Sequence, residues 1–201
     1  MPNGVQGDIQ DSYKVVDFLE LPYTVINIMP AYSSLVYQIT NPIGNLPKEI
    51  SLGCATNTPA RLRMTTLYAV AAQLGGFVVN TCNLSEDVVG YSTVFGDSAG
   101  DFSPFGKLTV TELLELGDNM CLPKDLVHKT PSDGMCGHSD EDALGFTYAE
   151  LDEFIRTGKK PSMTVYERIM YLNKKSHFKH EIIRLPTFDP GFPIAKELNW
   201  N

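Results

Sequence analysis

Residues 77–111 constrain what this chain of 201 residues can fold into more than any other stretch. The stretch opens with the run FVVN, which is short, apolar and β-favouring, as in a buried parallel strand. Hydroxyls and carboxylates then alternate with glycines, and they include Glu86, Asp97 and Asp101. Polar groups just past the carboxyl end of a buried strand occupy the place where open α/β sheets bind their ligands.

The acidic residues of this stretch limit the kind of ligand it can hold. Carboxylates repel a phosphate group unless a hard cation lies between the two. Three acidic positions among glycines therefore favour a metal-assisted phosphate site over a bare anion-binding loop. A solvated acidic loop is the alternative, and composition alone does not decide between them.

The residues before the strand predict a βαβ unit. Thr58 and Pro59 form a typical helix start, with a hydroxyl at the N-cap and proline at the first helical position. Gly75 and Gly76 end this helix, and a β-branched run at residues 23–29 predicts an earlier strand. Strand, helix and strand in this order predict an α/β fold with a parallel sheet and a right-handed crossover. The apolar spacing predicts one buried helix face made of Met64, Leu67, Ala71 and Leu74.

Capping patterns predict most of the other helices. A hydroxyl residue three positions before a glutamate predicts helices that open at Thr109, Thr147 and Thr164, and apolar residues at helical spacing after the last two predict an apolar face on each helix. Weaker helical patterns occupy residues 9–19 and 31–39.

Two stretches inside the chain and its last residues carry no such pattern. Residues 40–58 and 126–145 lack periodicity and are expected to be loops, the second of them functional or mobile. Residues 1–185 are expected to form one domain. Residues 186–201 contain three prolines and are expected to form an extended tail outside the core.

The composition favours a globular protein in a reducing compartment. Hydrophobic residues make up 43% of the chain, and the net charge of −8 argues against nucleic acid or an anionic membrane as a main partner. The four cysteines lack paired metal-ligand spacing and are too sparse for a disulfide scaffold. The sequence shows no apolar run of membrane-spanning length and no leader pattern, so a cytoplasmic protein is expected.

Five short motifs run through most of the chain: MPNGVQGD at residues 1–8, PARLRM at 59–64, NTCNLSE at 80–86, GDFSP at 100–104 and KTPSDGMCG at 129–137. Their combination resembles the ammonia-dependent NAD synthetase family, which belongs to the N-type ATP pyrophosphatases. The resemblance fades after about Lys179. The family's phosphate loop, Ser-Gly-Gly-x-Asp-Ser, does not occur in this sequence. The resemblance places that loop and the first strand upstream of Met1.

The resemblance implies a fold and a reaction. The implied fold is the three-layer, adenine nucleotide alpha-hydrolase-like one, with helices on both faces of a parallel sheet, here expected to be N-terminally incomplete. The implied reaction is the ATP- and Mg²⁺-dependent amidation of deamido-NAD to NAD through an adenylate, with ammonia as the nitrogen donor. The family also implies a homodimer whose deamido-NAD site is built across the subunit boundary.

The resemblance assigns roles to individual residues as well. It implies Glu86 as a magnesium ligand, Thr81 and Ser132 as ATP contacts, and Arg61, Asp101 and Lys179 as deamido-NAD contacts. Ser132 and Lys129 lie in a loop that folds over the reacting phosphates in the family, so both are catalytic candidates. A structural carboxylate at Glu86 and a strand cap at Thr81 are the alternatives.

Two neighbouring arginines are expected to behave differently. An arginine in the first turn of a helix opposes the helix dipole, so Arg61 needs an anionic partner, and a phosphate supplies one. Arg63 is expected to form a surface ion pair.

Departures from the family pattern keep a second hypothesis open. Val94 and Val110 stand where many members have lysine, contacting deamido-NAD and ATP, and Phe178 stands where many have histidine. Together with the absent phosphate loop, these departures allow a catalytically impaired remnant that only dimerises or binds nucleotide. A related ATP pyrophosphatase that acts on another carboxylate is a third, weaker hypothesis.

Overall fold

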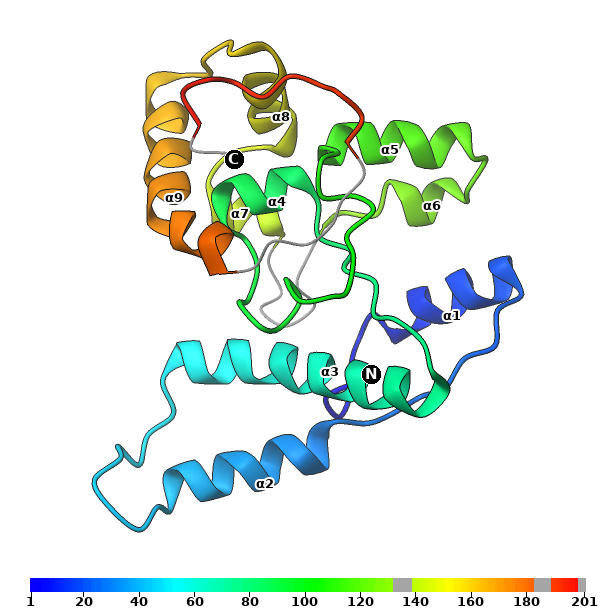
Figure 1. Cartoon of the computed structure of the whole chain (residues 1–201), viewed down its shortest axis with the longest axis vertical. Coiled ribbons are helices and arrows are strands. Elements are labelled where there is room, and N and C mark those ends of the chain that lie inside the picture. Colours follow the sequence, from blue (N-terminus) through cyan, green and yellow to red (C-terminus); the bar gives the residue numbers. More distant parts are fainter. Residues whose placement is uncertain (132–138, 183–188, 199–201) are drawn as a thin grey trace.

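The computed structural model describes residues 1–131, 139–182 and 189–198. Within them, the chain forms α1 (Ile9–Leu19), α2 (Met29–Thr40), α3 (Leu52–Leu74), α4 (Leu84–Val89), α5 (Val110–Asn119), α6 (Lys124–Val127), α7 (Asp140–Leu144), α8 (Tyr148–Thr157) and α9 (Met163–Ile182). Helices α1, α2 and α3 lie together in one part of the molecule, and the later helices form the other part (Figure 1). None of the helices described here is long and apolar enough to cross a bilayer.

The apolar core lies where α4, α8 and α9 meet. The apolar faces predicted for α8 and α9 are confirmed, because these helices bury the core side chains at the expected spacing. Burial of α4 on the same core fixes the orientation of the helix that carries Glu86. The fully buried core residues include Leu84, Val88, Leu151, Phe154, Ile155 and Ile169.

The predicted parallel sheet is not observed in the described residues, apart from one parallel bridge between Val79 and Phe102. Residues 23–28 form neither helix nor strand, and the backbone of residues 77–80 pairs with the chain at residues 101–102. The side chain of Phe77 is 79% exposed, so the prediction of a buried strand is wrong at this residue. An extended segment becomes a sheet strand only when neighbours accept and donate its backbone hydrogen bonds. The sequence pattern predicts β-favouring segments but does not place them side by side.

Two of the three predicted capping boxes are confirmed. The Thr109 hydroxyl accepts from the Glu112 N–H at the start of α5, and Thr147 does the same for Glu150 at the start of α8. The glutamate side chain completes the box in both cases. The third prediction is wrong by two residues. Helix α9 begins at Met163, and the hydroxyl of Ser162, rather than that of Thr164, accepts a backbone N–H (3.4 Å from Val165).

Two further capping boxes do not match the predicted pattern of a hydroxyl residue three positions before a glutamate. Asn83 and Glu86 form one at the start of α4, and Ser139 and Asp142 form one at the start of α7. Asparagine is as good an N-cap as serine, and a short aspartate can also return a hydrogen bond to the N-cap residue. The predicted loop at residues 126–145 is therefore interrupted by helices.

Helix α3 begins earlier than predicted and is less buried. It starts at Leu52, where the Ser51 hydroxyl accepts the Cys54 N–H (3.2 Å), and Pro59 lies inside it. The predicted buried face is also wrong, because Leu67 and Leu74 are exposed. Helix α2 lies beside α3 (Figure 1).

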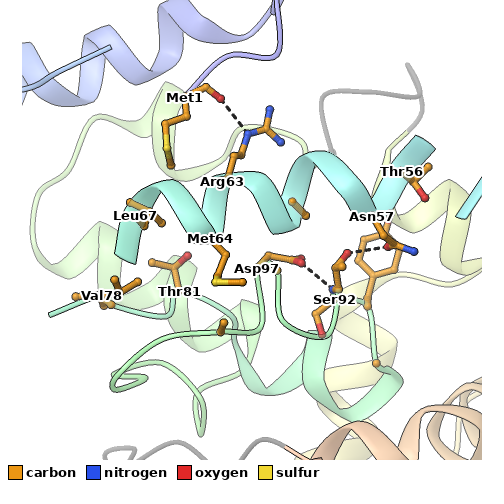
Figure 2. A pocket seen from close by; sticks show the side chains of 17 residues that line it. Met1, Thr56, Asn57, Arg63, Met64, Leu67, Val78, Thr81, Ser92 and Asp97 are labelled. Carbon is orange, nitrogen blue, oxygen red and sulfur yellow. Dashed lines mark hydrogen bonds between the residues drawn. The ribbon is translucent and has the colours of Figure 1, made fainter. Parts of the chain in front are cut away.

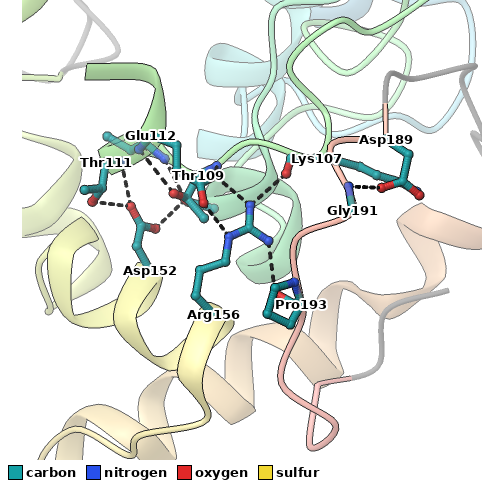
Figure 3. A network of polar contacts seen from close by, with 11 residues as sticks. Lys107, Thr109, Thr111, Glu112, Asp152, Arg156, Asp189, Gly191 and Pro193 are labelled. Carbon is teal, nitrogen blue, oxygen red and sulfur yellow. Dashed lines mark hydrogen bonds and ion pairs between the residues drawn. The ribbon is translucent and has the colours of Figure 1, made fainter. Parts of the chain in front are cut away.

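Residues 189–198 run across the core without helix or strand. The prediction that they stay outside the core is wrong for Ala195 and Leu198, which are both buried in it. The Ala195 N–H donates to the Ile155 carbonyl (2.6 Å). Arg156 donates to the Pro193 carbonyl (3.1 Å; Figure 3). The expected domain boundary at residues 185 and 186 lies outside the described residues.

Candidate functional site

A cavity of about 550 Å³ lies between α3, residues 78–81 and the loop at residues 90–99 (Figure 2). This volume is within the range of roughly 300–1,000 Å³ that is usual for small-molecule sites. Apolar side chains such as Met64 and Leu67 form much of its wall, and Arg63, Thr81 and Asp97 add polar groups. A mostly apolar wall with a few polar groups is typical of a ligand pocket.

One buried side chain shapes the polar wall of this cavity. The Asn80 amide donates to the carbonyls of Asp97 (2.7 Å) and Ala99 (3.3 Å), and its oxygen accepts from the Cys82 N–H (3.0 Å). A Cβ added to Gly100 would lie 2.7 Å from the Asn80 nitrogen, so this approach requires glycine. The acidic stretch is therefore a loop that is held by hydrogen bonds and not a freely solvated one.

Asp97 stabilises the loop by a hydrogen bond within it. Its carboxylate accepts the Thr93 N–H (2.7 Å), and the Thr93 hydroxyl donates to Asn57 of α3 (2.9 Å), as Figure 2 shows. These contacts tie the loop to the helix on the opposite side of the cavity. Asp97 thus holds its turn and also lines the cavity.

The two arginines of the PARLRM motif lie in different surroundings from those expected. The exposed Arg61 donates from Nε to the Val94 carbonyl (3.1 Å). The half-buried Arg63 donates to the Met1 carbonyl (2.9 Å) and to the Gln6 side chain (3.2 Å). The prediction of a surface ion pair for Arg63 is therefore wrong, because both of its partners are neutral. Arg63 lines the cavity and Arg61 does not.

Glu86 acts as a structural carboxylate, the alternative to a magnesium ligand, because it forms the capping box of α4. Its Oε2 accepts the Asn83 N–H (3.0 Å), and its own N–H donates to the Asn83 side chain (3.0 Å). Burial, together with the nearby Asp87, Asp140 and Asp97, raises the pKa of Glu86 to about 7, although the hydrogen bond from the Asn83 N–H opposes this shift. Glu86 does not line the cavity.

The acidic cluster around Glu86 is incomplete as a metal site. Burial and the neighbouring Asp97 raise the pKa of Asp87 to about 7, while the Lys179 ammonium lowers it. Among the described residues, no group of three or more His, Cys, Asp or Glu side chains is placed to hold a metal ion. Magnesium, however, is usually held by one or two carboxylates together with water and substrate phosphates. Glu86 and its neighbour Asp87 fit that smaller requirement.

The two remaining candidates for the deamido-NAD contact bind backbone groups. The exposed Asp101 carboxylate accepts the Val78 N–H (2.7 Å) and also a hydrogen bond from the Tyr68 hydroxyl. Lys179 donates to the carbonyls of Gly90 (2.7 Å) and Ser92 (2.6 Å). Asp101 follows the wall residue Ala99 closely in sequence, Lys179 reaches the wall residues Gly90 and Ser92 from α9, and neither side chain lines the cavity.

The catalytic candidates fall in and beside the part of the chain that is not described. Ser132 lies outside the described residues. Lys129 is described, and its ammonium pairs with Asp11 (2.8 Å) and Asp8 (4.0 Å) near α1. The structure therefore does not bring Lys129 to the cavity.

A family model described as NAD synthase matches residues 1–183. The chain belongs to the NAD synthase family. By family it is an ammonia-dependent NAD synthase, a ligase that forms a carbon–nitrogen bond, as the resemblance predicted.

Curated relatives from bacteria and archaea agree with this assignment. The NH₃-dependent NAD⁺ synthetase of Carboxydothermus hydrogenoformans is 36% identical over 180 residues, which are 89% of this chain and 72% of the relative. The synthetase of Thermococcus kodakarensis is 34% identical over 201 residues, 98% of this chain and 76% of the relative.

Solved structures show the same relationship in three dimensions. An NMN synthetase from Francisella tularensis superposes with a TM-score of 0.79 at 36% identity, covering 90% of this chain and 73% of that one. The NAD⁺ synthetase of Burkholderia pseudomallei gives a TM-score of 0.68 at 26% identity, with coverages of 90% and 68%. The chain therefore has the fold of NAD synthases, even though the described residues form almost no sheet.

Sequence reasoning about this NAD synthase missed two residues that shape the site. The sequence pattern predicts Asn80 only as a strand residue. Its polar side chain between Val79 and the acidic loop was the signal that could have indicated a role in holding that loop. Arg63 was assigned to the surface because arginines in helices are usually exposed. Its contacts to residues 1–6 depend on chain segments far apart in sequence, so no local pattern could reveal them.

Proposed function

We propose that this chain catalyses, or derives from an enzyme that catalyses, the ATP-dependent amidation of deamido-NAD to NAD. The cavity between α3 and residues 78–99 carries the proposal, because two family motifs meet there. Thr81 ends the extended segment and presents a hydroxyl to the cavity, where it would donate to ATP. Arg61 and Asp101 do not line the cavity, but they bind the neighbouring backbone at Val94 and Val78, and we keep both as proposed contacts of deamido-NAD.

The proposed reaction has two steps. The nicotinate carboxylate of deamido-NAD attacks the α-phosphorus of ATP, the bond to the bridging oxygen breaks, and pyrophosphate leaves. Ammonia then attacks the carboxyl carbon of the adenylate, AMP leaves with the bonding electron pair, and the nitrogen loses a proton to form the amide. Such a reaction depends mainly on positioning and on compensation of phosphate charge. We keep Ser132 and Lys129 as proposed catalytic residues. Lys129 must first leave its pair with Asp11.

Glu86 is the proposed protein ligand for Mg²⁺, with Asp87 beside it. When bound, the ion would neutralise charge on the phosphates. The raised pKa of both carboxyls is consistent with this proposal, because burial and, to a lesser extent, neighbouring carboxylates disfavour their charged forms, and a bound cation would offset both effects. Glu86→Gln keeps an acceptor for the capping bond and removes the charge. We expect it to raise the Mg²⁺ concentration needed for half-maximal ATP binding by about tenfold. Glu150→Gln, the same change in the exposed capping box of α8, is the matched control and should leave that concentration unchanged.

The direct test of the proposed function uses the whole chain. It is incubated with deamido-NAD, ATP, MgCl₂ and ammonium chloride, and NAD is measured by chromatography, while calorimetry measures the binding of ATP with Mg²⁺. Thr81→Ala should weaken ATP binding about fivefold, which corresponds to one hydrogen bond. Thr65→Ala is the control, because Thr65 lies on an exposed position of α3 away from the cavity. ATP binding without NAD formation would identify the impaired remnant, and the absence of any binding heat would contradict the proposal for this chain.

A second candidate substrate is supported by one of the comparisons. The Francisella tularensis structure that superposes on this chain with a TM-score of 0.79 is described as an NMN synthetase. Val94 also lacks the ammonium group that the family resemblance assigns to deamido-NAD. A mononucleotide lacks the second phosphate and the adenosine of deamido-NAD, so it would need no contact to that half of the dinucleotide. Parallel assays with nicotinate mononucleotide and deamido-NAD decide between the two by the ratio of their kcat/KM values.

We further propose that the chain forms a homodimer in the cytoplasm. The first three helices and residues 21–28 expose many large apolar side chains, including Phe18, Leu21, Tyr23 and Tyr37, which is unusual for a monomeric surface. Cys54, Cys82 and Cys121 are free thiols in the described part of the chain, which suits a reducing compartment. Sedimentation that shows only monomer at micromolar concentration would contradict the dimer.

A further inference from the structure

Helix α9 holds the backbone that leaves the C-terminal end of α4. The last carbonyls of a helix have no partner within the helix and need one from elsewhere. The buried Asn173 amide of α9 donates to the Val88 carbonyl (2.8 Å). Two turns further along α9, the Lys179 ammonium donates to the carbonyls of Gly90 (2.7 Å) and Ser92 (2.6 Å). Three carbonyls at alternate positions, those of Val88, Gly90 and Ser92, are thus bound by side chains of one helix.

A glycine permits this close approach. Gly90 ends α4 with a φ of +67°, in the left-handed region. A Cβ at this position would lie 2.0 Å from the Cβ of Ser176, so the two backbones can meet here only because Gly90 has no side chain. Ser176 lies one turn before Lys179 on α9. The contact at Gly90 therefore brings the Lys179 ammonium within reach of the loop.

The charges around Lys179 favour its position at the loop. Burial lowers the pKa of Lys179, the repulsion from Lys175 lowers it as well, and the nearby Asp97, Asp87 and Cys82 raise it. Two carboxylates thus attract the ammonium toward the loop while two carbonyls accept its N–H groups. Hydrogen bonds from a charged donor are about twice as strong as neutral ones.

The same carbonyls belong to the wall of the cavity. Gly90, Ser92, Thr93 and Asp97 all line it, while Lys179 does not. Asp97 stabilises this loop by accepting the Thr93 N–H within the loop (Figure 2). Lys179 stabilises it from α9 by donating to its carbonyls. We propose that Lys179 is a positioning residue that fixes the cavity wall at residues 90–97 by binding the carbonyls of Gly90 and Ser92, and that it does not contact the substrate. The contacts between Lys179 and the loop follow from the geometry. Only the role of the loop in nucleotide binding rests on the proposed function.

Hydrogen–deuterium exchange of the whole chain without ligand tests this assignment. Lys179→Met keeps the length of the side chain and removes its N–H donors. We expect the amides of Tyr91, Thr93 and Gly96, each of which donates a hydrogen bond in the structure, to exchange about tenfold faster. Lys175→Met is the matched control, because Lys175 is exposed one turn earlier on α9 and its ammonium lies 5.7 Å from the Tyr171 ring centroid. It should leave exchange at residues 90–99 unchanged.

Three outcomes separate the roles that Lys179 can have. Faster exchange confined to residues 90–99, largely reversed in Lys179→Arg because the guanidinium also offers several donors, supports positioning. Unchanged exchange together with ATP or deamido-NAD affinity that falls tenfold overturns the proposal, because Lys179 then contacts the ligand directly. A uniform rise across α4, α8 and α9 also overturns it, because Lys179 then only stabilises the fold.

A calorimetric titration of the wild-type chain with ATP and Mg²⁺ separates this proposal from the proposed function. If the wild type binds no nucleotide but Lys179→Met exchanges faster only at residues 90–99, the proposed function fails and the positioning role stands. If the wild type binds ATP, Lys179→Met should bind it about tenfold more weakly, since the wall at residues 90–97 is no longer held in place.

Discussion

The hydroxyl of Ser85 donates a hydrogen bond to the carboxylate of Asp152 at 2.5 Å, although 67 residues separate the two in sequence. The same carboxylate accepts the Thr111 N–H (2.8 Å) and the Thr111 hydroxyl (2.7 Å; Figure 3). The Ser85 oxygen in turn accepts the Val110 N–H (3.0 Å). One buried aspartate of α8 thereby joins the first turns of α4 and α5. An anion is favourable there because free N–H groups and the positive end of the dipole meet it.

Asp152→Ala should destabilise the protein by about 3 kcal/mol. The change leaves the buried Ser85 hydroxyl without its acceptor and removes the two hydrogen bonds from Thr111. A buried polar group without a partner carries the full cost of its desolvation. Urea denaturation followed by circular dichroism measures the effect. Glu153→Ala is the control, because Glu153 is the next residue and forms only an exposed ion pair with Lys159. It should cost less than about 1 kcal/mol. Equal effects of the two variants would contradict the role of Asp152.

Gly90→Ala should destabilise the protein by about 3 kcal/mol. The new methyl group would overlap Ser176 at 2.0 Å in a packed contact between α4 and α9, and the residue would keep an unfavourable positive φ. Gly158→Ala separates these two causes. Gly158 ends α8 with a φ of +75° and has nothing within 4 Å of its added Cβ, so its cost should be about 1 kcal/mol. The difference between the two midpoints of thermal unfolding gives the steric part, and identical midpoints would show that the helices can move apart.

Arg156→Lys should loosen residues 189–198 and destabilise the protein by about 2 kcal/mol. Arg156 donates to both oxygens of Glu112 (2.6 Å each) and to the carbonyls of Lys107 (2.8 Å) and Pro193 (3.1 Å; Figure 3). A lysine ammonium cannot make this planar fork of contacts. Hydrogen exchange at the Ala195 amide should become faster.

Arg168→Lys is the matched control for this prediction. Arg168 donates from Nε to the carbonyl of Leu144 (3.0 Å) and has no bidentate carboxylate partner among the described ion pairs. Its replacement should cost less than about 1 kcal/mol and leave the exchange of Ala195 unchanged. Slow exchange of Ala195 in Arg156→Lys would show that apolar packing alone holds the tail.

The ion pair of Glu112 predicts a loss of stability in acid. Burial by itself raises the pKa of Glu112, but hydrogen bonds from Arg156 and the Thr109 N–H outweigh burial and leave it below the ordinary value of 4.5. A carboxyl with a lowered pKa in the folded state contributes stability above its unfolded pKa and loses it as the pH falls through the folded pKa.

Glu112→Gln isolates this contribution because it keeps the capping bond and removes the charge. The free energy of unfolding of the wild type should exceed that of the variant at pH 6 and above, and the difference should shrink as the pH falls below 4.5. Glu115→Gln, an exposed change on the same helix, should match the wild type at every pH. A difference that stays constant from pH 7 to pH 3 would contradict the charge-based explanation.

Part of the candidate site could be predicted from the sequence. The motif around Thr81 and the acidic loop located the cavity wall, since the resemblance to a family depends on residue identity and short spacing alone. The chemical character of the loop also followed from its glycines and carboxylates. The capping box of Glu86 is a local contact whose asparagine N-cap the hydroxyl pattern did not include. The binding of Lys179 to backbone carbonyls, in contrast, depends on the packing of α9 against α4.

By itself, the sequence determined the features that depend on neighbours within a helical turn. The capping boxes at Thr109 and Thr147 and the apolar face of α8 formed as predicted, because their hydrogen bonds and contacts span three or four residues. Tertiary structure alone decided the rest. Whether the β-favouring run at residues 23–28 pairs, whether the Leu67 face of α3 is covered and which carbonyls Lys179 binds all depend on segments far apart in sequence. Such contacts form only when burial of the core brings those segments together, and no local pattern encodes that arrangement.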